Sequence, residues 1–535
     1  MPADRHAKKS SVCAVSIAQL LGPKGLLSRS RETVSRTFHL FRGDGILALV
    51  FRGSAWTLGI FATGQILRVG RNVALAALLF PEAFGLMAIA DMFSKGVRML
   101  SDVGFQPNVI RSENADDPRF LNTVWTMQVV RGLLVFGALV ALAYPLSRAF
   151  ALNDPAMGQL AVIMPVAAVG ALIAGFHSTS LLMMGREMRL GLRGGIMLTS
   201  RVVATAVMIG WAALDPSVWA LVSGGIAASI VVLALSHRFN TGCDNRFELD
   251  RSYAAEILRF GSWIFISTAL TFLAMQADRV LLAGLVSLQL LGIYAIAMVA
   301  ATIPREIFGT LLSSVLLPAL ARKHRESPDA FHTQVERARR TMLPMAGVCV
   351  GGLILFAPAF FHLLYDDRYS DAGWMAQLMA ISLWFALLSA FDTQVLLATG
   401  DSRSVAASNL ANVVVTALAA LTGFGAFGVP GFILGFGLGT AAGRLTLAAV
   451  CARAGLSSLR VEARHAFLLC ASVWILVLAS AVMNESVDFV DWRTLVLGSC
   501  MFFVALAHAF LALRRATGDT ASWRRRENET ESDNQ

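Results

Sequence analysis

Charged residues are scarce in this chain of 535 residues: Asp, Glu, Lys and Arg make up only 15% of it. A typical soluble domain carries about 25%. The six cysteines are widely scattered and form no C-x-x-C pair, a spacing that supports neither a zinc site nor a disulfide framework. The sequence contains no G-x-x-x-x-G-K-[ST], no H-E-x-x-H and no credible nucleophile triad. These absences argue against a soluble enzyme, nucleotide hydrolysis by this chain, and a bound metal or cofactor.

Long apolar stretches are what the chain has instead, with 56% hydrophobic residues and a mean hydropathy of +0.63. An apolar helix needs roughly 20 residues to cross a bilayer. By that measure the sequence predicts an all-α integral membrane protein with about fourteen transmembrane helices. The predicted spans are about 53–78, 84–107, 121–150, 158–180, 195–213, 217–236, 260–285, 290–318, 342–364, 374–398, 405–427, 430–450, 465–483 and 493–513.

The basic residues alternate between loops as membrane topology requires. If the N-terminus is cytoplasmic, the inward segments hold 33 of the 45 Lys and Arg residues, and Arg368 is the clear exception outside. The net charge of +10 therefore indicates orientation rather than a nucleic-acid partner. We expect a multi-pass membrane protein with both termini cytoplasmic and polar tails over 1–50 and 514–535. No outward loop exceeds about ten residues, which disfavours a polymerase or ligase working at the outer face.

The chain also matches itself when it is shifted by 207 residues. Trp56 falls on Trp263, Gly85 on Gly292, and Arg98 on Arg305. A duplicated helix bundle leaves such a trace, and such bundles enclose the central site of many secondary transporters.

The repeat predicts two pseudo-symmetric lobes of six helices around a central cavity. The N-lobe would comprise residues 51–238 and the C-lobe 258–453, joined by a cytoplasmic linker over 239–257. Residues 464–513 would add a terminal pair of helices. Within the C-lobe, glycines recur every fourth residue from Gly431 to Gly443, which predicts a face where a neighbouring helix approaches closely.

Ionisable side chains inside the predicted spans are unusually numerous and mostly cationic. Each costs a few kcal/mol in hydrocarbon, so they usually face a wet cavity or a partner. The sequence predicts cavity cations that bind substrate and carboxylates that are candidates for ion coupling. The cations are Arg68, Arg71, Lys95, Arg98, Arg131, Arg279 and Arg305, and the carboxylates are Asp91, Asp278 and Asp392.

Two interpretations of these charges stay open at this point. Asp91, Lys95, Arg98 and Asp102 lie on one helical stripe, which is either one wall of a cavity or a self-neutralised buried face. The arginines of the first span could also reach the outer headgroups. Many inward arginines suggest an anionic cargo, because arginine binds phosphate bidentately and keeps its charge when desolvated.

The sequence resembles the polysaccharide flippases of the multidrug/oligosaccharidyl-lipid/polysaccharide exporter superfamily over about residues 45–455. The resemblance rests on loose motifs whose order and spacing are specific as a set. They are Arg52-Gly-Ser-Ala-Trp56, Leu79-Phe-Pro-Glu-Ala-Phe-Gly85, Ser101-Asp-Val-Gly-Phe105, Phe120-Leu-Asn-Thr-Val-Trp125 with Arg131, Asp278-Arg-Val-Leu-Leu282, Leu291-Gly-Ile-Tyr294, Pro304 and Leu317-Pro318-Ala-Leu320.

The resemblance implies flipping of undecaprenyl-pyrophosphate-linked oligosaccharide across the bacterial inner membrane by alternating access, for lipopolysaccharide or exopolysaccharide synthesis. It implies coupling to H⁺ or Na⁺, and an Asp-Arg pair of related lipid II flippases would correspond to Asp278-Arg279. We expect a monomer that works with a polysaccharide polymerase and chain-length proteins. The alternatives are a multidrug exporter of the same superfamily, a membrane glycosyltransferase or polymerase, and a non-transporting scaffold.

Overall fold

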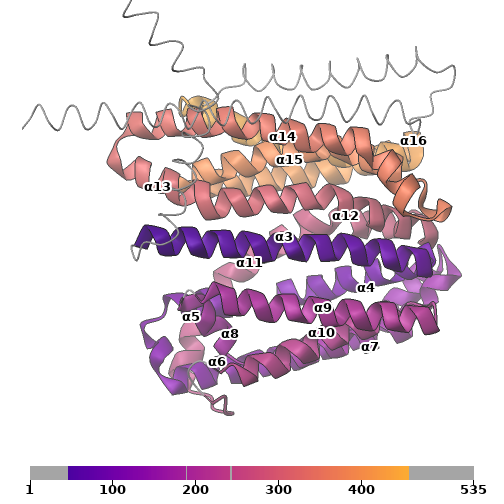
Figure 1. Cartoon of the computed structure of the whole chain (residues 1–535), viewed down its shortest axis with the longest axis horizontal. Helices are drawn as coiled ribbons and strands as arrows, with labels where there is room; N and C mark the ends of the chain where they lie inside the picture. Colours follow the sequence, from indigo (N-terminus) through magenta and orange to yellow (C-terminus); the bar gives the residue numbers. More distant parts are fainter. Residues whose placement is uncertain (1–45, 188, 241–243, 457–535) are drawn as a thin grey trace, which may run out of the picture.

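A computed structural model describes the chain over residues 46–187, 189–240 and 244–456 (Figure 1). Within these ranges the chain forms helices joined by loops, without strands, which confirms the predicted all-α class. The predicted helix pair over 464–513 and both terminal tails fall outside the described residues, apart from the last residues of the N-terminal tail, which begin α3. Those assignments, and the total of fourteen helices, stay predictions.

The helices of the first half alternate between long membrane-length elements and short connectors. In order they are α3 (Ile46–Leu78), α4 (Pro81–Leu100), α5 (Phe105–Arg111), η1 (Glu113–Asp116), α6 (Pro118–Ala151), η2 (Pro155–Gln159), α7 (Leu160–Gly175), α8 (Ser180–Arg186), α9 (Leu190–Leu214) and α10 (Trp219–Arg238).

The helices of the second half repeat this pattern with longer elements. They are α11 (Arg251–Ala283), α12 (Leu288–Leu311), the π-helical turn η3 (Leu312–Leu316), α13 (Leu317–Glu326), α14 (Pro328–Leu364), η4 (Asp367–Tyr369), α15 (Ala372–Ala398) and α16 (Ser402–Arg453).

These helices overlap the first twelve predicted spans, with two differences at their ends. The span predicted over 84–107 is broken, because α4 stops at Leu100 and Gly104 adopts a left-handed conformation (φ 69°) before α5. Residues 319–341, which lie between the eighth and ninth predicted spans, form most of α13 and the first turns of α14. Leu320 and Phe331 bury themselves in the core of the second half, which holds the two helices against each other.

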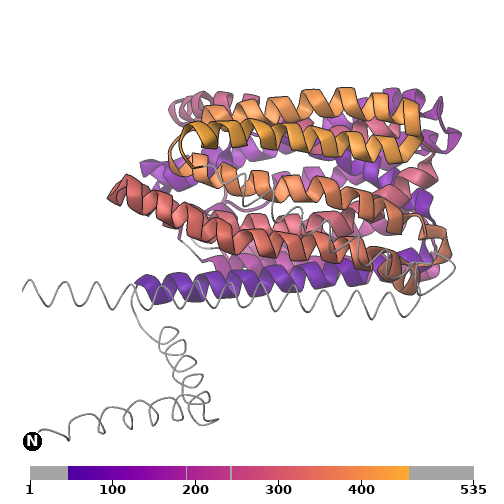
Figure 2. The same cartoon turned by 90° about the horizontal axis from the view of Figure 1, so that it is seen from above.

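The last element, α16, is two helices separated at Gly428, where the backbone has φ 62° and ψ −142°. This is the Gly/Pro turn between the eleventh and twelfth predicted spans. The two helices of α16 then lie side by side (Figure 2), because the predicted glycine face lets them approach closely. A Cβ on Gly435 would lie 2.3 Å from the carbonyl oxygen of Ala419, and one on Gly439 would lie 1.8 Å from Oγ1 of Thr416.

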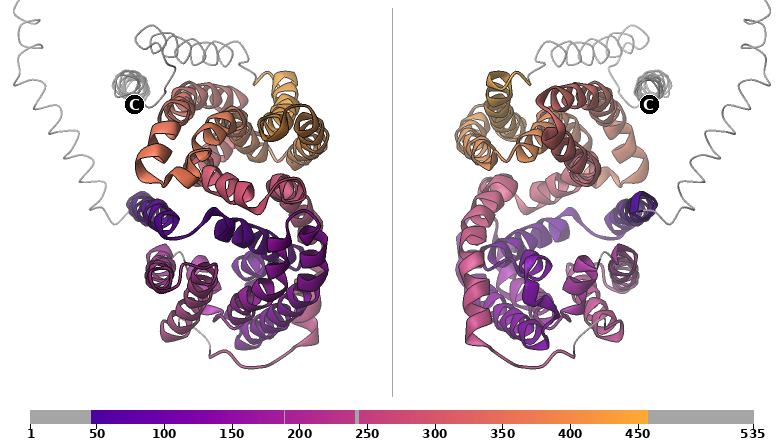
Figure 3. Two further views of the ribbon diagram at one scale, coloured as in Figure 1. Left: turned by 90° about the vertical axis from the view of Figure 1, so that its right-hand side faces the viewer. Right: turned by 90° about the vertical axis from the view of Figure 1, so that its left-hand side faces the viewer.

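The long helices run roughly alongside one another and gather into two groups when viewed end-on (Figure 3). One group contains α6, α7, α9 and α10, and the other contains α12, α14, α15 and α16. Helix α11 packs on α4, α6 and α16, and so it connects the two groups. The largest buried apolar cluster accordingly includes residues from both halves of the chain.

The linker between the halves is an extended segment held against α6. The backbone amides of Glu248 and Asp250 donate to Oγ1 of Thr126 and of Thr123, at 3.0 and 3.1 Å. Asp250 then caps α11, and the hydrogen bonds from the side chain and backbone of Ser252 lower the pKa of its carboxyl. The linker therefore ends at residue 250, earlier than the predicted boundary at 257, because this cap starts the helix.

Eight described helices are long and apolar enough to cross a membrane, by length and composition: α6, α7 with η2, α9, α10, α12, α14, α15 with η4, and α16. The other long helices are α3, α4 and α11, each of which carries several charged residues along its length. Charged helices need water or a partner inside a bilayer, so these three helices point to the functional site.

Candidate functional site

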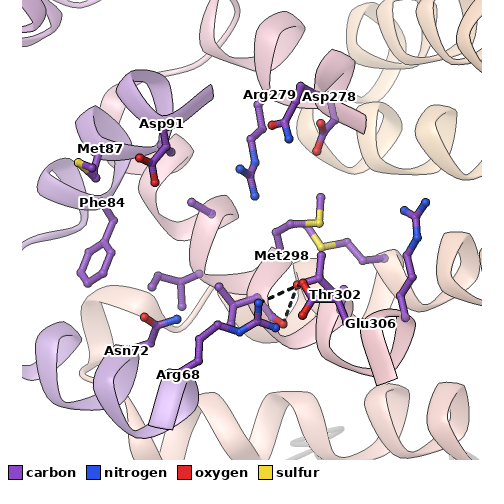
Figure 4. A pocket seen from close by; sticks show the side chains of 18 of the residues that line it. Arg68, Asn72, Phe84, Met87, Asp91, Asp278, Arg279, Met298, Thr302 and Glu306 are labelled. Atoms are coloured by element: carbon purple, nitrogen blue, oxygen red, sulfur yellow. Dashed lines mark hydrogen bonds and ion pairs between the residues drawn. The ribbon is translucent and has the colours of Figure 1, made fainter. Parts of the chain in front are cut away.

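A cavity of about 640 Å³ lies between the two halves of the chain (Figure 4). Its lining comes mainly from α3, α4, α11 and α12, with contributions from α9, α10, α15 and α16. The three long charged helices therefore meet at one space. Figure 4 shows Arg279 extending into this space from α11, while Arg68 approaches it from α3.

The internal repeat fixes the geometry of this cavity. A Cβ on Gly85 would lie 2.4 Å from the carbonyl oxygen of Leu288, and one on Gly292 would lie 1.8 Å from that of Pro81. The repeat aligns Gly85 with Gly292 and Pro81 with Leu288. The contact of Gly85 with Leu288 and the contact of Gly292 with Pro81 are therefore equivalent under the repeat. A pseudo-twofold axis therefore passes through the crossing of α4 and α12, where only glycine lets the two backbones approach so closely.

Because the two halves are related in this way, matched positions face the same space. Ala88, Asp91 and Lys95 of α4 line the cavity, and so do their counterparts Ala295, Met298 and Thr302 of α12. The shape of the cavity is thus symmetric while its chemistry is not.

The lining carries five cationic side chains and three carboxylates, and so has a formal charge of +2. Lys95 and Arg305 are exposed within it, so water can reach these charges. The structure brings together seven of the ten predicted site residues and adds Glu306. The charged lining residues are Arg68, Arg71, Lys95, Arg279, Arg305, Asp91, Asp278 and Glu306.

Glu306 joins the two halves across the cavity. Its Oε1 lies 3.1 Å from Nη1 of Arg68, and its Oε2 accepts a hydrogen bond of 2.8 Å from Nε2 of Gln65 (Figure 4). Both partners belong to α3, whereas Glu306 belongs to α12. Arg68 therefore pairs with a carboxylate across the cavity, which favours the cavity interpretation over headgroup contact.

Asp278 is the most buried carboxylate of the cavity, with 2% exposure. Its Oδ2 accepts a hydrogen bond of 2.9 Å from the hydroxyl of Tyr294, and its Oδ1 has no partner among the described residues. A carboxylate that is half satisfied in a cavity can accept a proton or a small cation. The repeat counterparts of Asp278 and Tyr294 are Arg71 and Met87, so this hydrogen-bonded carboxylate exists in the second half only.

Two predicted substrate cations lie outside the cavity lining. Arg131 donates through Nη2 to the carbonyl oxygen of Arg98 at 2.6 Å and through Nε to Oγ of Ser101 at 3.1 Å. Nη1 of Arg131 also lies 3.9 Å from the carboxylate of Asp102. Arg131 thus satisfies the end of α4, where carbonyl groups lack helical partners and attract cations. Arg98 lies in the last turn of α4, and its Nε donates to the carbonyl oxygen of Ser94.

Asp392 also lies outside the cavity lining, in the interior of the second half. Its carboxylate is 2.9 Å from Nη2 of Arg339 and 2.6 Å from Nη1 of Arg444, and its exposure is 1%. The three residues tie α14, α15 and α16 together. This geometry is that of a structural ion-pair cluster, so Asp278 is the better placed of the two predicted C-lobe coupling residues.

The sequence reasoning missed Glu306, Tyr294 and Arg339. Glu306 directly follows Arg305 in a predicted span, so the sequence shows a carboxylate inside the membrane at this position. The sequence does not show that its partners lie on α3. Arg339 lies just before the ninth predicted span, and α14 carries it into the protein interior. No group of three His, Cys, Asp or Glu side chains within the described ranges is placed to hold a metal ion.

Residues 74–373, more than half of the chain, match the model of a family described as polysaccharide biosynthesis protein. The chain belongs to this family. A curated relative, the amylovoran biosynthesis protein AmsL of Erwinia amylovora, is 21% identical over 299 residues. That match covers 54% of this chain and 71% of the relative.

Solved structures with similar folds are membrane transporters. The lipid II flippase MurJ in an inward closed conformation has a TM-score of 0.66 at 12% identity, covering 85% of this chain and 98% of that chain. An inward-facing multidrug resistance MATE family transporter of the MOP superfamily has a TM-score of 0.58 at 13% identity, covering 76% and 95%. The eukaryotic MATE transporter AtDTX14 has a TM-score of 0.55 at 15% identity, covering 78% and 97%. This member of the polysaccharide biosynthesis protein family therefore shares its fold with these membrane transporters.

Proposed function

We propose that the protein flips an undecaprenyl-pyrophosphate-linked oligosaccharide across the bacterial inner membrane, for lipopolysaccharide or exopolysaccharide synthesis. The observation that carries this proposal is the cavity between the two halves, with five cationic and three acidic side chains. A diphosphate diester carries two negative charges, equal and opposite to the formal charge of the lining. Arginine side chains present planar sets of donors that match phosphate oxygens.

Alternating access supplies the mechanism. The two halves would rock about the crossing of α4 and α12, where backbone lies against backbone at Gly85 and Gly292. The diphosphate would bind Arg68, Arg71, Arg279 and Arg305, while the polyprenyl chain stays in the bilayer. Lys95 would extend the positive field along α4.

Ion coupling is assigned to Asp278, with H⁺ or Na⁺ as the driving ion. Its free Oδ1 and its hydrogen bond from Tyr294 support this assignment. Protonation would remove one negative charge from the lining and so strengthen its attraction for the cargo. Asp91 is the second candidate, because it also lines the cavity.

The cavity charge separates this proposal from the alternative of a multidrug exporter. A cation exporter needs a negative or aromatic lining, whereas this lining is net positive and its aromatic residues are Phe84 and Phe436. Efflux of organic cations by purified protein in liposomes would favour the exporter instead. Elongation of glycan by the purified protein would favour a polymerase.

The test uses a strain in which the gene is deleted and complemented with wild type, Arg279→Ala or Arg238→Ala. Arg238 is exposed at the end of α10, outside the cavity, and serves as the matched control. We expect lipid-linked oligosaccharide to accumulate on the cytoplasmic face in the deletion and in Arg279→Ala, and to reach the outer face with wild type and Arg238→Ala. Complete intermediates on the outer face of the deletion strain would refute the proposal.

A further inference from the structure

Glu306 forms an ion pair with Arg68, which is one of the cationic side chains that the proposed cargo would bind. Glu306 uses both carboxylate oxygens, one for Nη1 of Arg68 and one for Nε2 of Gln65. The side chain of Glu306 is 43% exposed and that of Arg68 is 26% exposed. Water and ligands in the cavity can therefore reach this pair, which makes it exchangeable, unlike the buried cluster around Asp392.

Arg68 also keeps unused donors beside this pair. Its Nε and Nη2 are buried and have no hydrogen-bond partner among the described residues. A guanidinium has five N–H donors, and a single carboxylate oxygen at 3.1 Å leaves most of them free. A diphosphate offers more acceptor oxygens and more charge than one carboxylate. It can therefore compete with Glu306 for the same guanidinium.

The pair also bridges two helices that otherwise pack on different neighbours. Helix α3 packs mainly along α9, whereas α12 packs mainly on α4 and α15. Contacts between α3 and α12 are limited to a short stretch. Two hydrogen bonds to one carboxylate are therefore a substantial part of the contact between α3 and α12, while the end of α3 is held separately by the hydroxyl of Tyr369, which donates to the carbonyl oxygen of Leu79.

We propose that Glu306 is a resident counter-ion that the diphosphate of the cargo displaces, and that this exchange releases α3 from α12. The inference rests on the proposed function. Without cargo, Glu306 neutralises Arg68 and ties the halves together at this edge of the cavity. With cargo, phosphate oxygens take the donors of Arg68, and the negative charge of Glu306 is repelled from the occupied site.

Glu306 is thus a positioning and selectivity residue. A ligand with one weak acceptor cannot replace two hydrogen bonds, whereas a diphosphate can. The counterpart of Glu306 in the first half is Met99, so the exchange takes place in one half of the repeat only.

The experiment measures binding of inorganic pyrophosphate to the purified full-length protein, with inorganic phosphate as the weaker competitor. The variants are Glu306→Gln and, as the matched control, Glu336→Gln, whose side chain pairs with Arg340 at an exposed site outside the cavity. We expect Glu306→Gln to bind pyrophosphate about tenfold more tightly than wild type, with a smaller preference over phosphate. A tenfold change corresponds to about 1.4 kcal/mol, close to the range for one hydrogen bond to a charged group. Glu336→Gln should bind like wild type.

A second measurement needs no variant. Hydrogen exchange of wild type should become faster in α3 around Gln65 and Arg68 when pyrophosphate is added, because the bridge to α12 opens. In Glu306→Gln, exchange there should be fast in the absence of pyrophosphate. Unchanged exchange in wild type at saturating pyrophosphate would overturn the release of α3.

The outcomes separate this inference from the proposed function. If wild type and Glu306→Gln bind pyrophosphate equally, Glu306 is no counter-ion, while the anionic cargo still stands. If neither protein binds pyrophosphate, both proposals fail. If only Glu306→Gln binds measurably, displacement of Glu306 is the barrier to binding and the inference is supported.

Discussion

Gly292→Ala tests the crossing of α4 and α12 on which the two-lobe geometry depends. The new Cβ would lie 1.8 Å from the carbonyl oxygen of Pro81 and 3.1 Å from the amide nitrogen of Gly85. Carbon and oxygen atoms in contact need about 3.2–3.5 Å, so the two helices must separate by well over 1 Å at this point. Separation by 0.5–1 Å already forfeits roughly a quarter to a half of the dispersion energy of the contacts involved. Because backbone cannot turn aside as a side chain can, we expect a loss of about 2–3 kcal/mol in the free energy of unfolding.

The same helix supplies the control. Gly309 also lies in α12, and a Cβ there would meet nothing within 4 Å. Alanine favours a helix over glycine by about 1 kcal/mol, so Gly309→Ala should be neutral or stabilising. Gly85→Ala should fall between the two, because its nearest contact would be 2.4 Å. Denaturant unfolding of the purified proteins in detergent measures the order of stability of the three variants. Equal stability of Gly292→Ala and Gly309→Ala would refute the close crossing and with it the pseudo-twofold axis.

Three further predictions concern groups in the second half of the chain. Asp392→Ala should cost about 3–5 kcal/mol in the free energy of unfolding, because it leaves two buried arginines without their shared carboxylate; wild-type stability in denaturant would contradict the buried cluster. Tyr294→Phe removes the hydrogen bond to Asp278 and should shift the pH dependence of transport while the yield of folded protein is unchanged; an unaltered pH profile would argue against coupling there. Asp401 caps α16, and the hydrogen bonds from Ser404 lower the pKa of its carboxyl. This cap therefore stabilises the fold fully above the unfolded pKa of about 3.9. The contribution is lost as the pH falls through the folded pKa. Asp401→Ala should therefore lose stability relative to wild type near pH 6 and progressively less at lower pH, as thermal melting would show; a deficit independent of pH would contradict this.

The repeat and the hydropathy pattern together predicted most of the architecture. Matched positions such as Gly85 and Gly292 meet at the crossing, and apolar stretches coincide with helices because length and composition decide membrane helices almost locally. The cavity face of α4 was also predictable, since Asp91 and Lys95 share one helical stripe.

Partners across helices were not predictable in the same way. Helical periodicity predicts which face a charge occupies, but not which neighbouring helix that face meets. Arg131 was predicted to face the cavity and instead completes the end of α4, and Asp392 was expected there and instead joins two arginines. Glu306 is the reverse case, because its role depends on α3, which lies more than 200 residues earlier in the chain. A single sequence carries no signal for such pairs.

The contrast between symmetric shape and asymmetric charge bears on how the two halves of a duplicated bundle acquire different roles. Two lobes of six helices each enter the membrane from the same side, so identical halves would present the same charges to the cargo from both walls of the cavity. Here Arg71 and Asn72 of the first half stand where the second half has Asp278 and Arg279, and all four line the cavity. Asp91 and Lys95 likewise correspond in the repeat to Met298 and Thr302, which also line the cavity. The buried carboxylate with the hydrogen bond from a tyrosine therefore lies in one half, and the Asp91–Lys95 stripe in the other. In the proposed cycle, rocking about the glycine crossing would move these two sets relative to each other, so the charge divergence after duplication would let the two walls of the cavity act differently on the cargo.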